Sequence, residues 1–448
     1  MDGSTELLLV LFAAIALIVV LIVKVRIHAF LALLAACFVV GVGSGMPLSS
    51  IVASFEKGMG GTLGFLAAII GLGSILGKML EESGGAERIA QTLLARLGHQ
   101  RASWVMMLVG FIAGIPVFFE VGFVLLIPLV YVVARETKIN LLYLGVPLAV
   151  SLMAVHCMLP PHPAAMAVTG MLGADVGKVV LYGLVVGLPT AAIAGPLWIS
   201  WVCKRGASSD QHAFLAGHGD VQDEVRALPG FGITLLTIAL PLVLMVARTL
   251  TSSLPNVPFV AKLFAFVGNP LTALAIAVVF AYWSLGIRRG ATMASMLQST
   301  QKSFPPLAGI LLIIGAGGAF NGMLIDSGIG QVLAGKLAHS DLNPIFLAWL
   351  VAGLMHFAVG SATVAMMSAA GMVAPLLASH PTLRPEIMVI AVGAGAIGWT
   401  HVTDSAFWVV KEYLGVSLSE ALKKFSASTT LASVIALGLT LLLSTLVH

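Results

Sequence analysis

Apolar runs of about twenty residues recur along nearly the whole chain, and they limit the folds open to it. A spanning α-helix needs about 20 apolar residues to cross a hydrocarbon core about 30 Å thick. Of the 448 residues, 59% are hydrophobic and 9% charged, whereas soluble domains carry about 25% charged residues. The runs lie at roughly 7–23, 28–46, 61–80, 103–134, 141–172, 179–203, 230–250, 264–285, 304–325, 344–378, 386–410 and 427–447. They predict an all-α polytopic membrane protein, since β-barrel strands would alternate apolar and polar residues.

The charged residues indicate orientation in a bilayer and give no sign of nucleic-acid binding. The formal net charge is +4, and Lys and Arg lie in short loops between apolar runs, where cations set topology. Cys37, Cys157 and Cys203 are too few and too dispersed for a disulfide framework or a metal cluster. The acidic start MDGSTE lacks the basic segment of a secretory signal, so we expect the first run to be a retained helix.

The two halves of the chain resemble each other. A shift of 244 positions aligns FLAAIIGLGSILGKMLEESGGAERIA with AGILLIIGAGGAFNGMLIDSGIGQVLA without a gap, and a shift of 245 places His156 on His401. The ungapped MLxxSG match favours a true internal repeat. We predict a first repeat at 1–203, a cytoplasmic linker at 204–229 and a second repeat at 230–448.

The positions of the loop cations predict how the repeats are oriented. Asp2 and Glu6 precede the first helix and Lys24 and Arg26 follow it, which predicts an N-terminus outside the cell. Cations flank 103–134 on both sides, so this run is expected to enter and leave on one face as a hairpin. Placing the other loop cations on the inner face in the same way predicts that 344–378 is a second hairpin. About ten crossings and two re-entrant hairpins result, with inverted repeats and broken helices at the midplane, as in secondary transporters.

Four stretches interrupt the apolar pattern where lipid should surround a regular helix. They are GIPVFFEVGF (114–123) and HCMLPPHP (156–163) in the first half, and FAVGSATVAMMS (357–368) and GWTHVTDSAFW (398–408) in the second. Each half thus has one interruption in its hairpin and one in the following helix, about 141–172 and 386–410. This symmetry predicts one shared polar site.

In the first half the candidates are Phe119, Glu120, Gly122, His156, Pro161 and His162. An ionisable group at mid-membrane costs about 2.5–3.5 kcal/mol on insertion scales, so Glu120 is a candidate proton carrier or substrate-orienting carboxylate; the alternative is a structural cap at the hairpin tip. Three prolines around Pro161 remove backbone donors and free carbonyls. We expect His156, His162 or both to line a site, although each could instead donate to a helix carbonyl.

In the second half, small residues and hydroxyls at the hairpin tip suit a carboxylate at the start of a half-helix, or else serve close helix packing. Asp404 is the second candidate for the proton site, with a structural cap as the alternative. Lys78 is expected to extend to the interface and is less favoured as a counter-charge for an acidic substrate. The second-half candidates are Gly360, Ser361, Thr363, Thr400, His401, Thr403, Asp404 and Ser405.

The motifs FFEVGFVLLIPLV, HCMLPPHPAA and HVTDSAFWVVKEYLG, preceded by GKMLEESGGAERIA, resemble the gluconate:proton symporter (gluconate permease) family over essentially the whole chain. The resemblance implies proton-coupled uptake of gluconate or a related hydroxy acid across a bacterial cytoplasmic (inner) membrane. It also implies inverted repeats, homodimers and an elevator motion. The family includes carriers of D-serine, fructuronate, idonate and glycerate, and Cys157 stands where a small residue is expected.

The leading hypothesis is therefore an anion:proton symporter that uses Glu120, Asp404 or His156 for proton coupling. The proton is the coupling ion, and no cofactor or metal is expected because no spacing matches a known ligand pattern. An intramembrane enzyme is disfavoured by the repeat and by the lack of a nucleophile beside a base. A channel is disfavoured because its pore should carry repeated polar rings.

Overall fold

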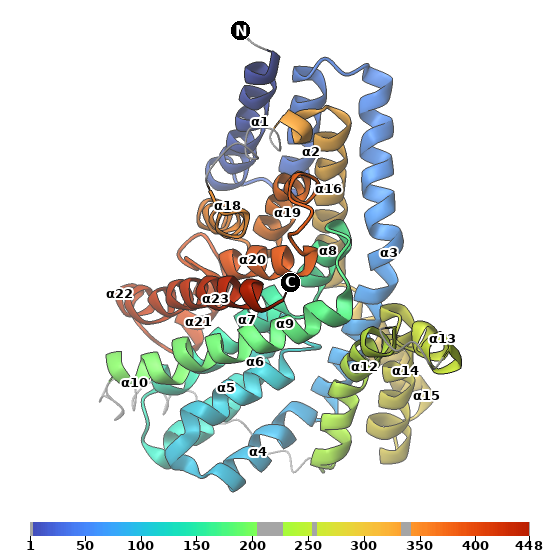
Figure 1. The fold of residues 1–448 in the computed structure, drawn as a ribbon. Helices are drawn as coiled ribbons and strands as arrows, with labels where there is room; N and C mark the ends of the chain where they lie inside the picture. Colours follow the sequence, from blue (N-terminus) through green and yellow to red (C-terminus); the bar gives the residue numbers. More distant parts are fainter. Residues whose placement is uncertain (1–2, 204–226, 253–257, 333–341, 448) are drawn as a thin grey trace.

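The computed structural model describes residues 3–203, 227–252, 258–332 and 342–447, and every regular element in these ranges is a helix (Figure 1). The expected linker at 204–229 lies outside the described residues except for its last three positions. The first-half helices are α1 (Gly3–Val19), α2 (Ala29–Gly43), α3 (Leu48–Glu82), α4 (Gly85–Leu97), α5 (Ala102–Ala113), α6 (Phe119–Thr137), α7 (Leu141–Met158), α8 (Pro163–Met171), α9 (Val176–Ala192) and α10 (Trp198–Val202).

The second half is also helical throughout its described ranges. Its helices are α12 (Phe231–Ser252), α13 (Pro258–Val267), α14 (Pro270–Ala281), α15 (Met293–Ser303), α16 (Leu307–Asp326), α18 (Pro344–Val359), α19 (Ala362–Ser379), α20 (Pro385–Ile397), α21 (Ser405–Tyr413), α22 (Leu418–Ala421) and α23 (Ala427–Leu446). Within the described residues, eight helices are long and apolar enough to cross a membrane. The chain is a multi-pass membrane protein.

Asparagine begins several helices by accepting a backbone hydrogen bond. The side chains of Asn140, Asn269 and Asn343 accept from the backbone N–H two residues further on, in α7, α14 and α18. In α14 and α18 a proline follows at the first helical position, where its missing N–H costs nothing. These caps fix where the helices begin.

α3 is longer than the apolar pattern indicates. It begins at Leu48, well before the predicted start near residue 61, because Ser54, Glu56 and Lys57 can all continue a helix and Ser54 donates to Asp326 at 2.6 Å. α3 runs beside α16 along one side of the molecule (Figure 1). A Cβ at Gly58 would lie 2.8 Å from the backbone of Ala319, so glycine permits this close approach.

The four sequence interruptions coincide with four breaks in the helices. α5 and α6 are separated by residues 114–118, and α7 and α8 by residues 159–162, where the Pro160–Pro161 bond is cis. In the second half, residues 360–361 separate α18 from α19, and residues 398–404 separate α20 from α21. α7 and α20 pack against each other near the middle of the molecule, so the two halves meet there (Figure 1).

Candidate functional site

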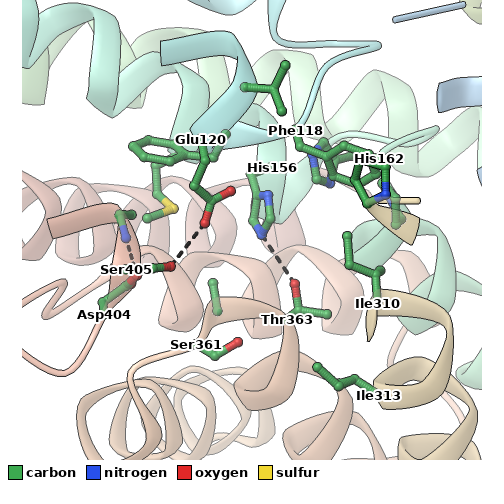
Figure 2. Close-up of a pocket in the computed structure, with 17 residues that line it drawn as sticks. Phe118, Glu120, His156, His162, Ile310, Ile313, Ser361, Thr363, Asp404 and Ser405 are labelled. Atoms are coloured by element: carbon green, nitrogen blue, oxygen red, sulfur yellow. Dashed lines mark hydrogen bonds between the residues drawn. The ribbon is translucent and has the colours of Figure 1, made fainter. Parts of the chain in front are cut away.

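The breaks surround one cavity of about 330 Å³ (Figure 2). It receives residues from the first turn of α6, the end of α7, the break before α8, the start of α19 and the start of α21, with one wall formed by α16. Its lining is Phe118, Phe119, Glu120, Val121, Met153, His156, His162, Pro163, Pro306, Ile310, Ile313, Ser361, Ala362, Thr363, Asp404, Ser405 and Ala406. Eight of the residues singled out from sequence therefore meet in one place.

Glu120 links the two halves across this cavity. It lies in the first turn of α6, which starts after an extended backbone at Phe118. Its Oε1 accepts a hydrogen bond of 3.1 Å from the Ser405 hydroxyl in the first turn of α21 (Figure 2). Ser405 thus holds one oxygen of a carboxylate that also lines the cavity, so Glu120 is placed to accept from a bound molecule.

His156 and His162 form a pair of rings in the same cavity. Their centroids are 4.2 Å apart, and Phe118 packs edge-to-face on His162 at 5.7 Å. His156 Nε2 lies 3.5 Å from the Thr363 hydroxyl. Within the described residues, His156 Nδ1 and both ring nitrogens of His162 are buried without a hydrogen-bond partner. Because buried polar atoms are normally satisfied, these nitrogens indicate a wet or ligand-filled site.

The start of α19 presents backbone N–H groups and hydroxyls to the same cavity. Gly360 adopts a φ of 68° at the end of α18, and a Cβ there would lie 2.2 Å from the Thr403 carbonyl oxygen, so only glycine fits. Ser361 then caps α19 by accepting from the Val364 N–H. The positive end of an 18-residue helix therefore points toward the cavity.

Asp404 is held by two different groups. Oδ1 accepts from the Ala406 N–H at 2.8 Å, which makes Asp404 the N-cap of α21. Oδ2 lies 2.8 Å from Nε2 of His356, a fully buried histidine whose Nδ1 lies 2.7 Å from the Gly398 carbonyl oxygen. His356 was missed from sequence because it precedes the polar stretch at 357–368 by one residue. A lone ionisable residue in an apolar helix was the available signal.

Comparisons with known proteins agree over the whole chain. Residues 5–447 match the GntP family permease family. The chain belongs to the GntP permease family. It is 50% identical over 440 residues to the D-serine transporter DsdX of Escherichia coli, covering 97% of both proteins. It is 42% identical over 447 residues to a gluconate permease of Pseudomonas aeruginosa, covering 99% of both. This GntP family permease is thus a transporter and not an enzyme.

Two solved transporters share the fold of the permease. Neisseria gonorrhoeae MtrF, described within a class of antimetabolite efflux pumps, matches with a TM-score of 0.66 at 14% identity, covering 94% of this chain and 96% of that one. The YdaH transporter of Alcanivorax borkumensis matches with a TM-score of 0.63 at 16% identity, covering 94% and 98%. At these identities the likeness concerns the fold alone.

The remaining predicted residues of the permease lie outside the lining of the cavity. Gly122 is buried against Leu152, and Gly360 forms the turn before α19. Thr400 is buried and donates to the Ile397 carbonyl, whereas Thr403 is exposed. Two others line separate hollows: Pro161 a small neighbouring cavity, and His401 an apolar groove, where its Nε2 bonds the Phe357 carbonyl at 2.9 Å.

An apolar wall and a second cavity could not be recognised in the sequence. Pro306, Ile310 and Ile313 at the start of α16 form the wall, and apolar helix residues carry no signature that distinguishes a wall from a packed core. A cavity of about 190 Å³ adjoins the first and shares Phe118, Val121 and Pro306 with it. Its lining includes Lys78, Glu81 and Lys302, and Lys78 pairs with Glu81 at 2.6 Å.

In residues 3–203, 227–252, 258–332 and 342–447, no group of three His, Cys, Asp or Glu side chains is arranged to hold a metal ion.

Proposed function

We propose that this permease imports a small organic anion of the gluconate or D-serine kind, together with protons, across the bacterial inner membrane. The observation that carries the proposal is the cavity in which a helix N-terminus, two carboxylates and two histidines from all four breaks face one another. The relatives named for gluconate and for D-serine supply the two substrate classes. Both substrates combine a carboxylate with hydroxyl or ammonium donors.

The polar groups of the cavity fit the two ends of such a molecule. We assign the substrate carboxylate to the start of α19, where Ser361, Thr363 and free backbone N–H groups favour an anion. Glu120 and Ser405 would then meet the donors at the other end. A carboxylate such as Glu120 accepts from hydroxyls as well as from an ammonium group, so it suits both substrate classes. The histidine pair would contact the middle of the molecule.

Inverted repeats with re-entrant hairpins also form part of the proposal. Each half contains a helix pair with a break, α5–α6 or α18–α19, followed by a broken helix, α7–α8 or α20–α21, in the same order. This correspondence supports repeats at 1–203 and 230–448 around a site between them. An elevator motion of a homodimer, and an N-terminus on the periplasmic side, belong to the same proposal.

Uptake into proteoliposomes tests the proposed function. We expect gluconate, D-serine or both to accumulate when the interior is alkaline, and a protonophore to abolish the accumulation. Uptake that persists unchanged after the gradient collapses would contradict proton coupling. A stabilisation screen with sugar acids and D-serine identifies the substrate, since a ligand that binds only the folded protein raises its Tm.

Glu120→Gln tests the assigned substrate contact. Loss of a charge-assisted hydrogen bond, worth about 1.5–3 kcal/mol, should raise KM by about 10–100-fold. The rise should be larger for D-serine, because an amide still accepts from a hydroxyl but cannot pair with an ammonium charge. Glu412→Gln is the matched control, since this glutamate is exposed on α21 and pairs with Lys411. An equal effect of both substitutions would refute the contact.

A further inference from the structure

The buried contact between His356 and Asp404 contains information about where a proton resides. Nδ1 of His356 lies 2.7 Å from the Gly398 carbonyl oxygen. A carbonyl can only accept a hydrogen bond, so Nδ1 carries a hydrogen. On the other side of the ring, Nε2 lies 2.8 Å from Asp404 Oδ2. An ionised carboxylate and an unprotonated Nε2 would face each other as two acceptors, so this contact requires one further proton.

The second oxygen of Asp404 narrows the position of that proton. Oδ1 accepts from the Ala406 N–H at 2.8 Å and therefore carries no hydrogen of its own in this bond. The extra proton lies on Nε2 or on Oδ2. In either position the pair as a whole is neutral, and when the proton leaves the pair carries one negative charge.

The pair is also placed so that its charge is felt by a substrate. His356 is fully buried behind Asp404, whereas Asp404 lines the cavity. Ser405, the next residue, donates to Glu120, so one turn of α21 touches both carboxylates of the cavity. A negative charge in a poorly solvated site repels a second anion strongly. A substrate carboxylate is therefore favoured only when the pair holds its proton.

We propose that the His356–Asp404 pair carries the coupling proton and that Glu120 does not. This inference rests on the proposed function and assigns its proton to one place. Proton and substrate carboxylate then favour each other's binding, and the coupling is reciprocal. When the substrate leaves, the anion that favoured the protonated pair is gone, so the pair holds its proton less tightly and can release it.

Other titratable groups near the pair have different surroundings. Glu120 on α6 is bonded by Ser405, and His401 in the same loop as Asp404 bonds the Phe357 carbonyl. His156 touches Thr363 at 3.5 Å and lacks a partner at Nδ1 among the described residues. Around the pair, the titratable residues are Glu120, His156, Cys157, His162 and His401. None of these five residues replaces the contact between His356 and Asp404, in which a histidine and a carboxylate meet directly at 2.8 Å.

Substrate affinity as a function of pH tests the inference in the purified full-length protein. The probe is gluconate or D-serine, whichever the wild type binds. As pH rises and the pair loses its proton, we expect affinity to fall by up to about tenfold per pH unit. In Asp404→Asn, which cannot lose the proton, affinity should not change with pH and proton-driven accumulation should be lost. Glu120→Gln should bind more weakly but keep the wild-type slope.

Two further measurements keep the test decisive if Asp404→Asn does not fold. His356→Gln supplies a permanent neutral donor to Oδ2, so proton-driven accumulation should be lost, and thermal unfolding should show that the variant remains folded. Proton uptake on substrate binding can be followed with an indicator dye in weak buffer, at a pH where the wild-type affinity falls with rising pH. It should approach one proton per wild-type molecule and zero in His356→Gln. If His356→Gln keeps both accumulation and proton uptake, the contact with His356 does not hold the proton, and the assignment to the pair is refuted.

The outcomes separate this inference from the function on which it rests. Wild-type uptake that ignores a proton gradient would refute the proposed function itself. A coupled wild type together with a coupled Asp404→Asn, or with a Glu120→Gln variant that loses the pH slope, would refute only the assignment to the pair.

Discussion

The broken helix of the first half and that of the second half solve the same problem by different means. The break at 159–162 contains prolines, which remove backbone donors, and it leaves ring nitrogens of His156 and His162 without partners in the described chain. The break at 398–404 contains no proline and bonds its polar groups internally: His401 to Phe357, Thr400 to Ile397, and Asp404 to His356 and Ala406.

This difference indicates that the two breaks have different roles. Groups with unused hydrogen-bonding capacity can exchange partners with a solute, whereas groups fixed by the protein can hold a defined charge state. The first break therefore suits recognition of the substrate and the second suits storage of the proton. Glu120 and Ser405 join the two regions through one hydrogen bond.

The largest effect is expected from Gly360→Ala, which would disturb the fixed break directly. The new Cβ would lie 2.2 Å from the Thr403 carbonyl oxygen, next to Asp404, and the φ of 68° disfavours any side chain. We expect transport to fall at least tenfold, with a lower Tm. Gly64→Ala in α3 is the control, since a Cβ there would meet no atom within 4 Å apart from its chain neighbours and its own helix backbone.

Transport assays of the two purified variants, with thermal unfolding of each, measure this difference. Normal transport by Gly360→Ala would mean that transport does not require the observed backbone conformation of the turn before α19. The second break would then be less rigid than its hydrogen bonds indicate.

Two single substitutions, one of His156 and one of His401, test the comparison through effects of intermediate size. His156→Gln should raise KM by about tenfold, the value of one hydrogen bond to the substrate, with little change in Tm. His401→Gln should instead lower Tm and leave KM nearly unchanged, because His401 bonds the Phe357 carbonyl and lies outside the lining of the cavity. Uptake kinetics and thermal unfolding of both variants provide the measurements, and the reverse pattern would overturn the assignment of different roles to the two breaks.

Much of this site could be predicted from sequence because polar groups and prolines are conspicuous in apolar helices. The cost of burying Glu120 or Asp404 in a membrane marks them as functional candidates before any fold is known. The direction of each side chain could not be predicted, since it depends on the path of a short irregular segment. Asp404 faces the cavity and its neighbour Thr403 is exposed, although the two residues look equivalent in sequence.

His356 shows a second kind of gap. Its role depends on a contact with a residue 48 positions away, and no local pattern pairs the two. The α16 wall was missed for a related reason. Ile310 and Ile313 are ordinary residues for a membrane helix, and only the packing of α16 against α3 and α19 brings them to the cavity. Periodicity identifies helices, but tertiary packing decides which of their faces form a site.

The smallest expected effect concerns the path into the cavity. The adjoining hollow is lined by Lys78 and Lys302 and shares Phe118 with the main cavity, so we expect an anionic substrate to pass it. Lys78 is paired with Glu81, which reduces its attraction for a second anion. Lys302 is exposed and should raise the local concentration of anions through its field.

Lys302→Gln should therefore raise KM about two- to threefold at low ionic strength, because one exposed charge contributes little more than about 0.5 kcal/mol. The difference should vanish in about 0.5 M salt, where the Debye length is only a few Å. Lys262→Gln is the matched control, since Lys262 is equally an exposed helix lysine but lies on α13, away from both cavities. Uptake kinetics at two salt concentrations measure the effect. A salt-independent change would indicate that Lys302 contacts the substrate itself, and the recognition now assigned to the first break would extend into this entrance.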